Sequence, residues 1–164
     1  LAQSEGIKLI SIDESGKIDL TIDGADEVDR SFNGIKGGGG ALLFEKIVAL
    51  SSEKNIWIVD SAKLVDRLGK FPLPVEVIPF GYKRVFKIIE EMNLNPVIRK
   101  NGNEFYFTDS GNLIFDLHIG EINDPVSMNE ELKLINGIVE TGLFINIADI
   151  VIAGKNNTTE IINK

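Results

Sequence analysis

Short apolar runs open the chain, and two of them predict strands. Residues 7–12 form the first run, and residues 18–23 alternate apolar and polar side chains with a period of two. This alternation places Ile18, Leu20 and Ile22 on one face of a strand. The first part of the chain is therefore expected to contribute two strands to a sheet.

A longer apolar segment follows and has the period of a helix. Residues 1–5 are typical of the tail of an earlier helix that ends at Gly6, and residues 27–36 have the composition of a polar loop. Residues 41–50 are apolar almost all round, as in a helix that is buried against a sheet. The exception is Glu45, which shares one side of this helix with small residues.

The next apolar run is nearly continuous. Residues 55–60 have the pattern of a parallel strand that is buried on both faces. Asp60 or Ser61 can cap a short helix over residues 62–68, which Gly69 would end. Alternation of strand and helix is typical of an open α/β sheet.

Three prolines change the pattern and indicate where a second domain begins. Pro72, Pro74 and Pro79 punctuate an extended segment. The elements predicted after Pro72 are a strand, a helix, two strands, a helix and a strand, over residues 75–78, 82–92, 96–100, 112–119, 127–136 and 138–144. This βαββαβ order is that of a ferredoxin-like domain.

The end of the chain is expected to return to the first sheet. Residues 148–154 have the pattern of another buried strand, and the residues after them are typical of a polar tail or turn. The predicted fold class is α/β, with a Rossmann-like open sheet that is incomplete at the N-terminus and a small ferredoxin-like βαββαβ α+β domain. The expected division gives residues 1–71 plus 145–164 to the first domain and residues 72–144 to the second.

Composition narrows the class of protein. The chain has 164 residues, of which 43% are hydrophobic, enough to build a core. Its 17 basic and 25 acidic residues give a net charge of −8, which argues against nucleic acid or an anionic membrane as the main partner. With no cysteine and one histidine, disulfides, thiol nucleophiles and Cys or His metal clusters are excluded, and no metal or cofactor is expected. Because no apolar run is long enough to span a bilayer and no signal segment opens the chain, we expect a cytoplasmic protein.

Charged side chains gather at the predicted strand ends. Asp23 and Asp26 end one strand, Lys36 precedes a run of glycines, and Lys63 follows the next strand. Ligands of open α/β sheets bind outside the carboxyl ends of the strands, so these side chains are candidates for a site. Each also has an ordinary explanation, because Asp-Gly favours turns and a surface lysine is usually solvated.

Four glycines, Gly37 to Gly40, directly precede the predicted helix. Glycine lets a backbone approach a ligand, and the free N–H groups of a helix N-terminus favour an anion. The run lacks the Lys-Ser/Thr of a Walker A loop and the spacing of a dinucleotide-binding loop. It could also be a flexible linker, so both interpretations stay open.

Glu45 is the sharpest candidate for chemistry. A carboxylate on an otherwise apolar helix costs desolvation free energy unless it is paired or used, and proton transfer is one such use. The alternatives are a pair with the neighbouring Lys46 or exposure to solvent. The single histidine, His118, is more simply explained as a structural residue of the strand predicted over 112–119 than as a catalytic one.

At these residues the chain closely resembles the A type of ribose-5-phosphate isomerase, the metal-independent family of the pentose phosphate pathway. The resemblance runs from about Ile7 to the C-terminus. It rests on Asp-Gly-Ala-Asp-Glu at 23–27, Ile-Lys-Gly-Gly-Gly at 35–39, Glu-Lys-Ile at 45–47, Asp-Ser-Ala-Lys at 60–63, Leu-Gly-Lys-Phe-Pro-Leu-Pro-Val-Glu-Val-Ile-Pro at 68–79, Gly-Leu-Phe at 142–144 and the apolar strand at 148–154. The string at 68–79 is long and has no variable gaps, so chance similarity does not explain it.

This resemblance implies interconversion of D-ribose 5-phosphate and D-ribulose 5-phosphate through an enediolate. It implies that Glu45 is the proton-transferring base and that Asp23, Asp26 and Lys36 are further catalytic residues. The residues implied in substrate binding are those of the matching motifs: Asp23, Gly24, Ala25, Asp26, Lys36, Gly37, Gly38, Gly39 and Lys63. It also implies a sugar phosphate as the ligand and a homodimer or homotetramer, with the small domain near the subunit contacts.

One departure from the family leaves other hypotheses open. The family has an early Gly-Thr-Gly-Ser-Thr phosphate loop, which this chain lacks, and the chain begins with Leu1. We therefore expect a fragment of a longer isomerase, poorly active by itself. Alternatively, the same fold could serve as a sugar-phosphate sensor domain of a transcription regulator, which would bind without turnover. A third alternative is a subunit-contact fragment that has no site.

Overall fold

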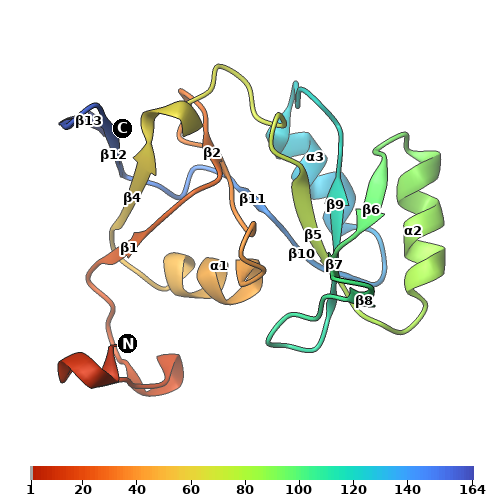
Figure 1. Ribbon diagram of the computed structural model, residues 1–164, viewed down its shortest axis with the longest axis horizontal. Coiled ribbons are helices and arrows are strands. Elements are labelled where there is room, and N and C mark those ends of the chain that lie inside the picture. The colour runs from red at the N-terminus through yellow and green to blue at the C-terminus, as the bar shows by residue number, and fades with distance from the viewer. Residues whose placement is uncertain (1) are drawn as a thin grey trace.

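The computed structural model describes residues 2–164, and it places a mostly parallel sheet beside a smaller antiparallel one (Figure 1). The first sheet has four strands in the order β1-β4-β12-β13, with the bounds Thr21–Asp23, Asn55–Asp60, Ile150–Lys155 and Thr158–Asn163. Strands β1, β4 and β12 are parallel, and β13 is antiparallel to β12. The carboxyl ends of the parallel strands therefore meet at one edge of the sheet.

Burial explains why the centre of this sheet could be predicted. β4 has a parallel neighbour on each side, and its Trp57 and Val59 are buried, as is Val151 of β12. A strand in that position needs apolar side chains almost without interruption. The strands predicted over 55–60 and 148–154 are confirmed, but burial of β4 on both faces is wrong, because Ile58 is 53% exposed.

The second sheet has four antiparallel strands in the order β10-β5-β9-β6, with the bounds Ile138–Thr141, Leu73–Val77, Leu113–Leu117 and Pro96–Ile98. Helices α2 (Tyr82–Glu91) and α3 (Pro125–Lys133) complete the βαββαβ order. This is the ferredoxin-like arrangement, in which the two strands at the ends of the motif are neighbours at the centre and edge of one sheet. The predicted fold class is confirmed.

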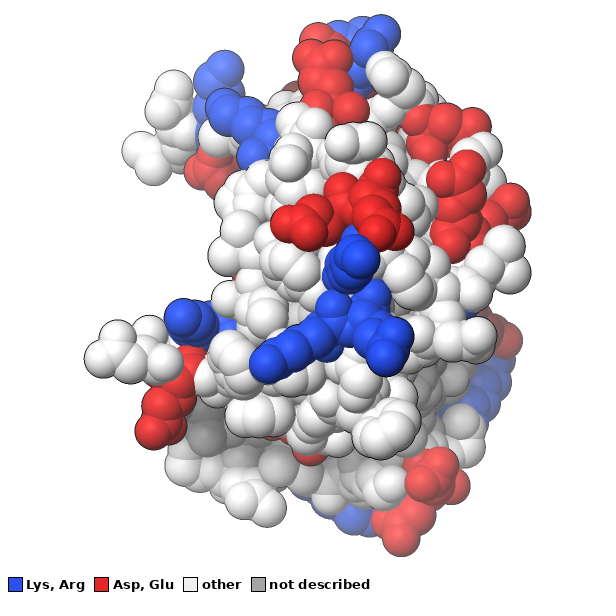
Figure 2. All heavy atoms as spheres, turned by 90° about the vertical axis from the view of Figure 1, so that its right-hand side faces the viewer, with Lys and Arg blue, Asp and Glu red and all other residues white. Residues whose placement is uncertain are grey.

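Both helices pack against the second sheet through apolar side chains. Val85 and Ile89 of α2 and Leu132 of α3 are buried in one core with Val75 and Phe115 of the strands. The charged residues of α2 are exposed, namely Lys83, Arg84, Lys87, Glu90 and Glu91. Figure 2 shows the side of the molecule on which α2 lies, with basic and acidic side chains gathered in adjacent patches.

A three-stranded sheet, β11-β3-β2, lies between the two larger ones (Figure 1). Its strands are Leu143–Phe144, Gly34–Ile35 and Glu27–Val28. The single strand predicted over 138–144 is divided at Gly142, because β10 pairs with β5 whereas β11 pairs with β3. Gly142 connects the two sheets, since its N–H donates to the carbonyl of Pro74 (2.7 Å) and its carbonyl accepts the N–H of Lys36 (2.9 Å).

The segment before β1 differs from its prediction. It contains two 3-10 turns, η1 (Gln3–Glu5) and η2 (Ile12–Glu14), and η1 ends at Gly6 as expected, while Leu1 lies outside the described residues. Residues 7–12 form no strand with any described segment, and Ile7 is 59% exposed. The strand predicted over 18–23 is reduced to β1. A strand pattern is not sufficient where no neighbouring strand supplies hydrogen bonds.

The helix predicted over 62–68 is wrong. Only Ser61–Lys63 forms a helical turn, η3, because the N–H of Val65 donates to the carbonyl of Val28 in β2 instead of continuing the helix. Asp60 caps this turn as predicted, since its Oδ1 accepts a backbone N–H of the turn at 2.8 Å.

Three segments predicted as irregular or left without an element form strands. The loop expected over 27–36 contains β2 and β3, which pair with each other. The expected polar tail contains β13, because residues 158–163 complete the free edge of β12. A hairpin of β7 (Lys100–Asn101) and β8 (Glu104–Phe105) follows β6.

Helix α1 (Leu42–Leu50) confirms the helix predicted over 41–50. Its burial is one-sided rather than all round in the described chain: Leu42, Lys46 and Ala49 are buried, whereas Phe44 and Leu50 are exposed. Within residues 2–164, no helix is both long enough and apolar enough to cross a membrane.

Candidate active site

An open hollow of about 170 Å³ lies at the carboxyl end of β1. The residues predicted for catalysis or substrate binding all line it, although they come from distant segments: Asp23, Gly24, Ala25, Asp26, Lys36, Gly37, Gly38, Gly39, Glu45 and Lys63. A larger hollow of about 400 Å³ beside β2, β12 and β13 contains none of them. Convergence of polar groups, rather than size, therefore identifies the candidate site.

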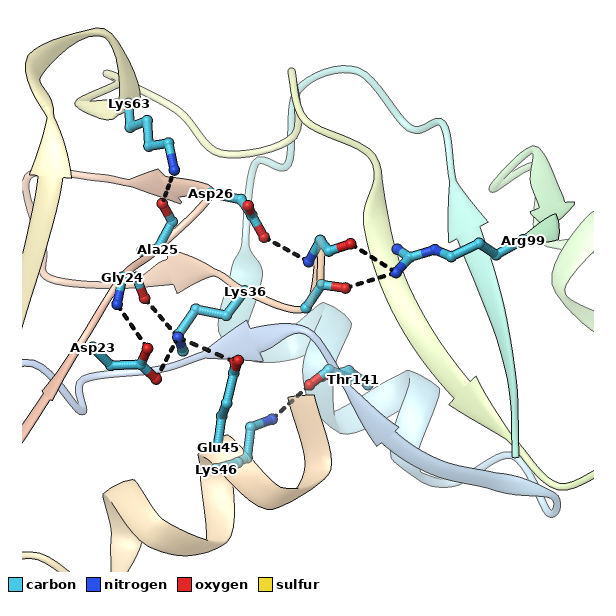
Figure 3. Close-up of polar contacts among 12 residues, drawn as sticks. Asp23, Gly24, Ala25, Asp26, Lys36, Glu45, Lys46, Lys63, Arg99 and Thr141 are labelled. Atoms are coloured by element: carbon cyan, nitrogen blue, oxygen red, sulfur yellow. Dashed lines mark hydrogen bonds and ion pairs between the residues drawn. The ribbon is translucent and has the colours of Figure 1, made fainter. Parts of the chain in front are cut away.

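Lys36 lies at the centre of the polar contacts (Figure 3). Its Nζ donates to Asp23 Oδ2 at 2.8 Å and to the carbonyl of Gly24 at 2.5 Å, and it lies 3.2 Å from Glu45 Oε2. Only 4% of the Lys36 side chain is exposed. A buried ammonium group requires such oxygen partners, because they replace the water it has lost.

Glu45 approaches Lys36 from α1, and its side chain is 28% exposed. Its Oε2 is buried and accepts no hydrogen bond, so the ion pair with Lys36 is the contact that this atom makes. The alternative of a pair with Lys46 is wrong, because the Lys46 ammonium donates to Glu140 Oε1 at 2.8 Å. The two neighbouring side chains of α1 thus point to different parts of the molecule, and Glu45 is the one that lines the hollow.

Lys46 ties α1 to the strands behind it. Its ammonium also donates to the carbonyls of Thr141 (2.7 Å) and Leu143 (2.9 Å). Burial lowers the pKa of Lys46, and the charge of Glu140 opposes that effect. Burial alone would raise the pKa of Glu140, but the charge and hydrogen bond of Lys46, with hydrogen bonds from Thr141 and Lys133, hold it below its ordinary value. Each charge of this buried pair thus favours the charged form of the other.

The three acidic residues of the motif at 23–27 point in different directions. Asp26 Oδ2 accepts the N–H of Gly38 at 2.8 Å, which holds the glycine loop beside the motif. Glu27 points the other way and is buried: its two oxygens accept the N–H groups of Gly69 (2.6 Å) and Phe71 (2.7 Å). Of the motif's three acids, Glu27 thus supports the fold and the two aspartates face the hollow.

The glycine loop is ordered by contacts on all sides, so the linker interpretation is wrong. The N–H of Gly38 donates to Asp26, and that of Gly40 donates to the carbonyl of Gly37 at 3.0 Å. Within residues 2–164, the N–H groups of Gly37 and Gly39 have no such acceptor. The hydrogen-bond donors expected from the whole loop are thus reduced to the N–H groups of Gly37 and Gly39. Leu42, the first residue of α1, does not line the hollow.

Lys63 enters the hollow from the far side. It ends the three-residue turn η3. Its ammonium donates to the carbonyl of Ala25 at 2.8 Å (Figure 3). Lys63 therefore adds positive charge at the rim of the hollow.

Comparison with known proteins identifies the family to which this chain belongs. A family model described as "Ribose 5-phosphate isomerase A (phosphoriboisomerase A)" matches residues 1–158. The ribose-5-phosphate isomerase A of Limosilactobacillus reuteri strain DSM 20016 is 52% identical over 162 residues, which cover 99% of this chain and 71% of the relative. The chain belongs to the ribose 5-phosphate isomerase A family.

Solved structures agree with this assignment. A D-ribose-5-phosphate isomerase in complex with phospho-erythronic acid is 40% identical with a TM-score of 0.94, over 99% of this chain and 72% of that chain. The ribose 5-phosphate isomerase A of Methanocaldococcus jannaschii is 38% identical with a TM-score of 0.91, over 99% of this chain and 73% of that chain.

Ribose 5-phosphate isomerase A interconverts ribose 5-phosphate and ribulose 5-phosphate, and the chain is an isomerase of this kind that takes a sugar phosphate as substrate. The relatives named above are all isomerases and give the sensor hypothesis no support. The described residues hold no group of three or more His, Cys, Asp or Glu side chains arranged to bind a metal ion.

No sequence motif predicted two residues that flank the β7-β8 hairpin and contact the glycine loop. Arg99 donates to the carbonyls of Gly37 (2.9 Å) and Gly38 (3.0 Å), and the hydroxyl of Tyr106 donates to the carbonyl of Gly39 (3.2 Å). A single arginine after a strand has no motif around it, so no local signal could identify these contacts. His118, at the exposed end of β9, does not line the hollow.

Proposed function

We propose that Glu45 is the base that moves the proton in this isomerisation. The observation that carries the proposal is the position of its carboxylate: Oε2 lies 3.2 Å from Lys36 Nζ, accepts no hydrogen bond, and belongs to a residue that lines the hollow. A base for a C–H proton must reach the substrate with a free lone pair. Glu45 lines the hollow with a side chain that is 28% exposed, and because its Oε2 is buried beside Lys36, Oε1 would be the oxygen that takes the proton.

The chemistry requires one proton transfer between carbons and one between oxygens. In the aldose-to-ketose direction the base removes the proton from C2, and the electrons of that C–H bond form the enediolate while the C1 oxygen becomes negative. The same carboxylic acid then returns the proton to C1, and the hydroxyl proton of O2 is transferred to the negative O1, so that O1 becomes the hydroxyl group and O2 the ketone oxygen. One carboxylate on one face of the planar intermediate is sufficient for the carbon transfers.

Lys36, Asp23 and Asp26 are proposed as the remaining catalytic residues. The ammonium of Lys36 lies beside Glu45, where it would stabilise negative charge on the enediolate oxygens without a metal ion. Asp23 and Asp26 would hold sugar hydroxyls and assist ring opening. The proposed contacts to the rest of the substrate come from the other residues of the hollow: Gly24, Ala25, Gly37, Gly38, Gly39 and Lys63.

A relative's ligand supports this arrangement. One solved isomerase of 40% identity is in complex with phospho-erythronic acid. Its carboxylate is planar and negative, as is the enediolate, so a site that stabilises the intermediate should bind it. We propose that the same compound binds in the hollow of this protein.

The test is a Glu45→Gln variant of the full-length protein, which keeps the size of the side chain and removes its basicity. We expect ribulose 5-phosphate formation to fall by about 10²- to 10⁴-fold, while binding of phospho-erythronic acid changes much less. Glu53→Gln serves as the matched control, because Glu53 follows α1 but is exposed and pairs with the exposed Lys17. A Glu45→Gln enzyme of full activity would remove Glu45 as the base. A metal chelator should leave the rate unchanged.

Charge at the hollow bears on the phosphate group. Three carboxylates, of Asp23, Asp26 and Glu45, face two ammonium groups, of Lys36 and Lys63. A dianionic phosphate needs more donors than this balance provides. This shortage of donors supports the prediction that these 164 residues alone have low activity. The homodimer or homotetramer and the cytoplasmic location also stay predictions.

The domain division is also a proposal. It is supported by the sheets, since β1, β4, β12 and β13 come from residues 1–71 plus 145–164, and the ferredoxin-like sheet comes from residues 72–144. All ten residues of the hollow fall in the first of these parts. The second part would then reach the site only through contacts such as those of Arg99.

A further inference from the structure

The glycine loop is held from the side opposite the hollow by two residues that flank the β7-β8 hairpin, Arg99 and Tyr106. Arg99 Nη1 donates to two consecutive loop carbonyls, those of Gly37 (2.9 Å) and Gly38 (3.0 Å), and the Tyr106 hydroxyl donates to the next one, that of Gly39 (3.2 Å). Three neighbouring peptide groups are thus oriented by side chains that do not line the hollow.

The geometry of the peptide group determines where the loop N–H groups point once the carbonyls are held. In a planar trans peptide, the N–H points opposite to the C=O. The peptide between Gly37 and Gly38 shows the result: its carbonyl faces Arg99 and its N–H faces Asp26 on the other side (Figure 3). The carbonyl of Gly38 also faces Arg99, so the N–H of Gly39 is directed to the same side as Asp26. No acceptor for it lies within residues 2–164.

Arg99 is itself fixed in place. Its Nε donates to Asp116 Oδ2 at 2.9 Å and its Nη2 donates to Asp116 Oδ1 at 2.5 Å, with both side chains less than one-fifth exposed. This fork-to-carboxylate pair fixes the plane of the guanidinium and leaves Nη1 for the loop. It also balances the charge of Arg99, so Arg99 acts on the loop as a hydrogen-bond donor.

We propose that Arg99, fixed by Asp116 and assisted by Tyr106, is a positioning residue that keeps the Gly39 N–H directed at the oxygen that becomes negative during isomerisation. The inference rests on the proposed function of the hollow. Glycine peptides rotate at little cost, so the loop needs an external constraint to keep this donor in place. Because the oxygen carries its charge in the transition state and not in the bound substrate, the constraint should act on kcat more than on KM.

The experiment compares Arg99→Met, Arg99→Lys and Tyr106→Phe in the full-length protein. We expect Arg99→Met to lower kcat by about 10- to 100-fold with KM changed less than about threefold, since one correctly placed oxyanion donor is worth at least this much. Inhibition by phospho-erythronic acid should weaken by a factor similar to the loss in kcat. Arg99→Lys, which keeps the charge but cannot make the fork and both carbonyl contacts, should recover little of the activity, and Tyr106→Phe should lose about threefold.

The matched control is Arg67→Met, which removes an exposed arginine that pairs with Glu121 and Asn123. It should change neither kcat nor inhibition. Thermal unfolding identifies any Arg99 variant that loses activity because it no longer folds, and Tyr106→Phe then carries the test. Wild-type kcat and inhibition in folded Arg99→Met, or an equal loss in kcat and substrate affinity, would overturn the inference. Glu45→Gln is assayed in parallel: if it keeps full activity, the proposed function fails, whereas an inactive Glu45→Gln beside an unaffected Arg99→Met refutes the positioning role alone.

Discussion

Lys36 is the residue at which the polar contacts of the site converge. Its ammonium donates to Asp23 and to the carbonyl of Gly24, pairs with Glu45, and lies 5.3 Å from the centre of the Phe144 ring. Losing hydration costs an ammonium group several kcal/mol unless oxygens replace the water. The side chain is therefore held in one position, with its ammonium between the carboxylates of Asp23 and Glu45.

Close approach of backbones constrains Gly142, which lies beside the site. A Cβ there would overlap the carbonyl of Lys36 and lie 2.8 Å from Pro74 Cδ. We expect Gly142→Ala to lower the free energy of unfolding by about 2 kcal/mol, because a methyl group forced into a packed site costs that much.

Gly39→Ala is the matched control for that substitution. No atom lies within 4 Å of a Cβ added at Gly39, so urea denaturation should give an unfolding free energy within about 0.5 kcal/mol of the wild type. Equal effects of the two alanines would show that chain flexibility, rather than close packing, explains the need for glycine at Gly142.

At the scale of elements, α1 connects the reaction site with the strands behind it. Two successive residues point in different directions: Glu45 faces the hollow, and Lys46 binds β10 and the residues around it. The Lys46 ammonium also lies 4.8 Å from the centre of the Phe144 ring, which the Lys36 ammonium approaches as well. The placement of α1, and with it the proposed base Glu45, thus depends on the buried Lys46–Glu140 pair, which does not line the hollow.

Removing Lys46 should weaken the fold strongly. We expect Lys46→Met to lower the free energy of unfolding by about 3 kcal/mol, because it leaves Glu140 buried with one fewer cation and removes one donor from each of the carbonyls of Thr141 and Leu143. Chemical denaturation measures this loss. Lys87→Met is the control, since Lys87 and its partner Glu91 are exposed, and it should cost less than about 0.5 kcal/mol. The double variant Lys46→Met/Glu140→Gln should recover part of the loss, and a double variant that loses the sum of both effects would contradict a coupled pair.

Elements were predictable where their own side chains decide the structure. Helix α1 and strand β4 have continuous apolar patterns, and Asp60 caps the turn after β4 as its sequence indicates. Elements that depend on a distant partner were not predictable. Residues 62–68 leave the helical path for a hydrogen bond to Val28, and the strands in 27–36 exist because β11 returns to pair with β3.

At the scale of the whole molecule, acid should destabilise the fold through carboxyl groups whose pKa is lowered. The pKa of Glu140 is below its ordinary value of 4.5, since Lys46, Thr141 and Lys133 together outweigh the opposite effect of burial. Hydrogen bonds from Ser127 lower the pKa of Asp124, at the start of α3, from 3.8. A lowered folded pKa means that the unfolded state binds more protons, so this stability is complete above the unfolded pKa and is lost as the pH falls through the folded pKa.

We therefore expect the melting temperature to fall as the pH drops below about 4.5, and the fall to be smaller in Glu140→Gln than in the wild type. Thermal unfolding between about pH 3 and pH 7 measures the difference. Glu53→Gln, at an exposed position, should follow the wild-type curve. A Glu140→Gln protein with the wild-type dependence would show that other groups govern acid unfolding.

The assembled site is also a property of the whole molecule. Its ten lining residues come from β1 and the turn after it, the glycine loop, α1 and η3, and its glycine loop is held by a side chain of the ferredoxin-like part. Local patterns placed the acids at a strand end and the glycines before a helix, so the hollow could be predicted from its own residues. They contained nothing about Arg99, because a contact across 61 or 62 sequence positions leaves no local pattern.

The sequence by itself determined the fold class, the family and the ten residues of the hollow, because periodicity and unbroken motifs are local properties of the chain. The tertiary structure decided which of those residues are free to act. It paired Lys46 with Glu140 rather than with Glu45, turned Glu27 into the fold, and engaged two of the four loop N–H groups. Such assignments depend on which donors and acceptors meet across the fold, and each buried polar group takes the partner that packing brings to it.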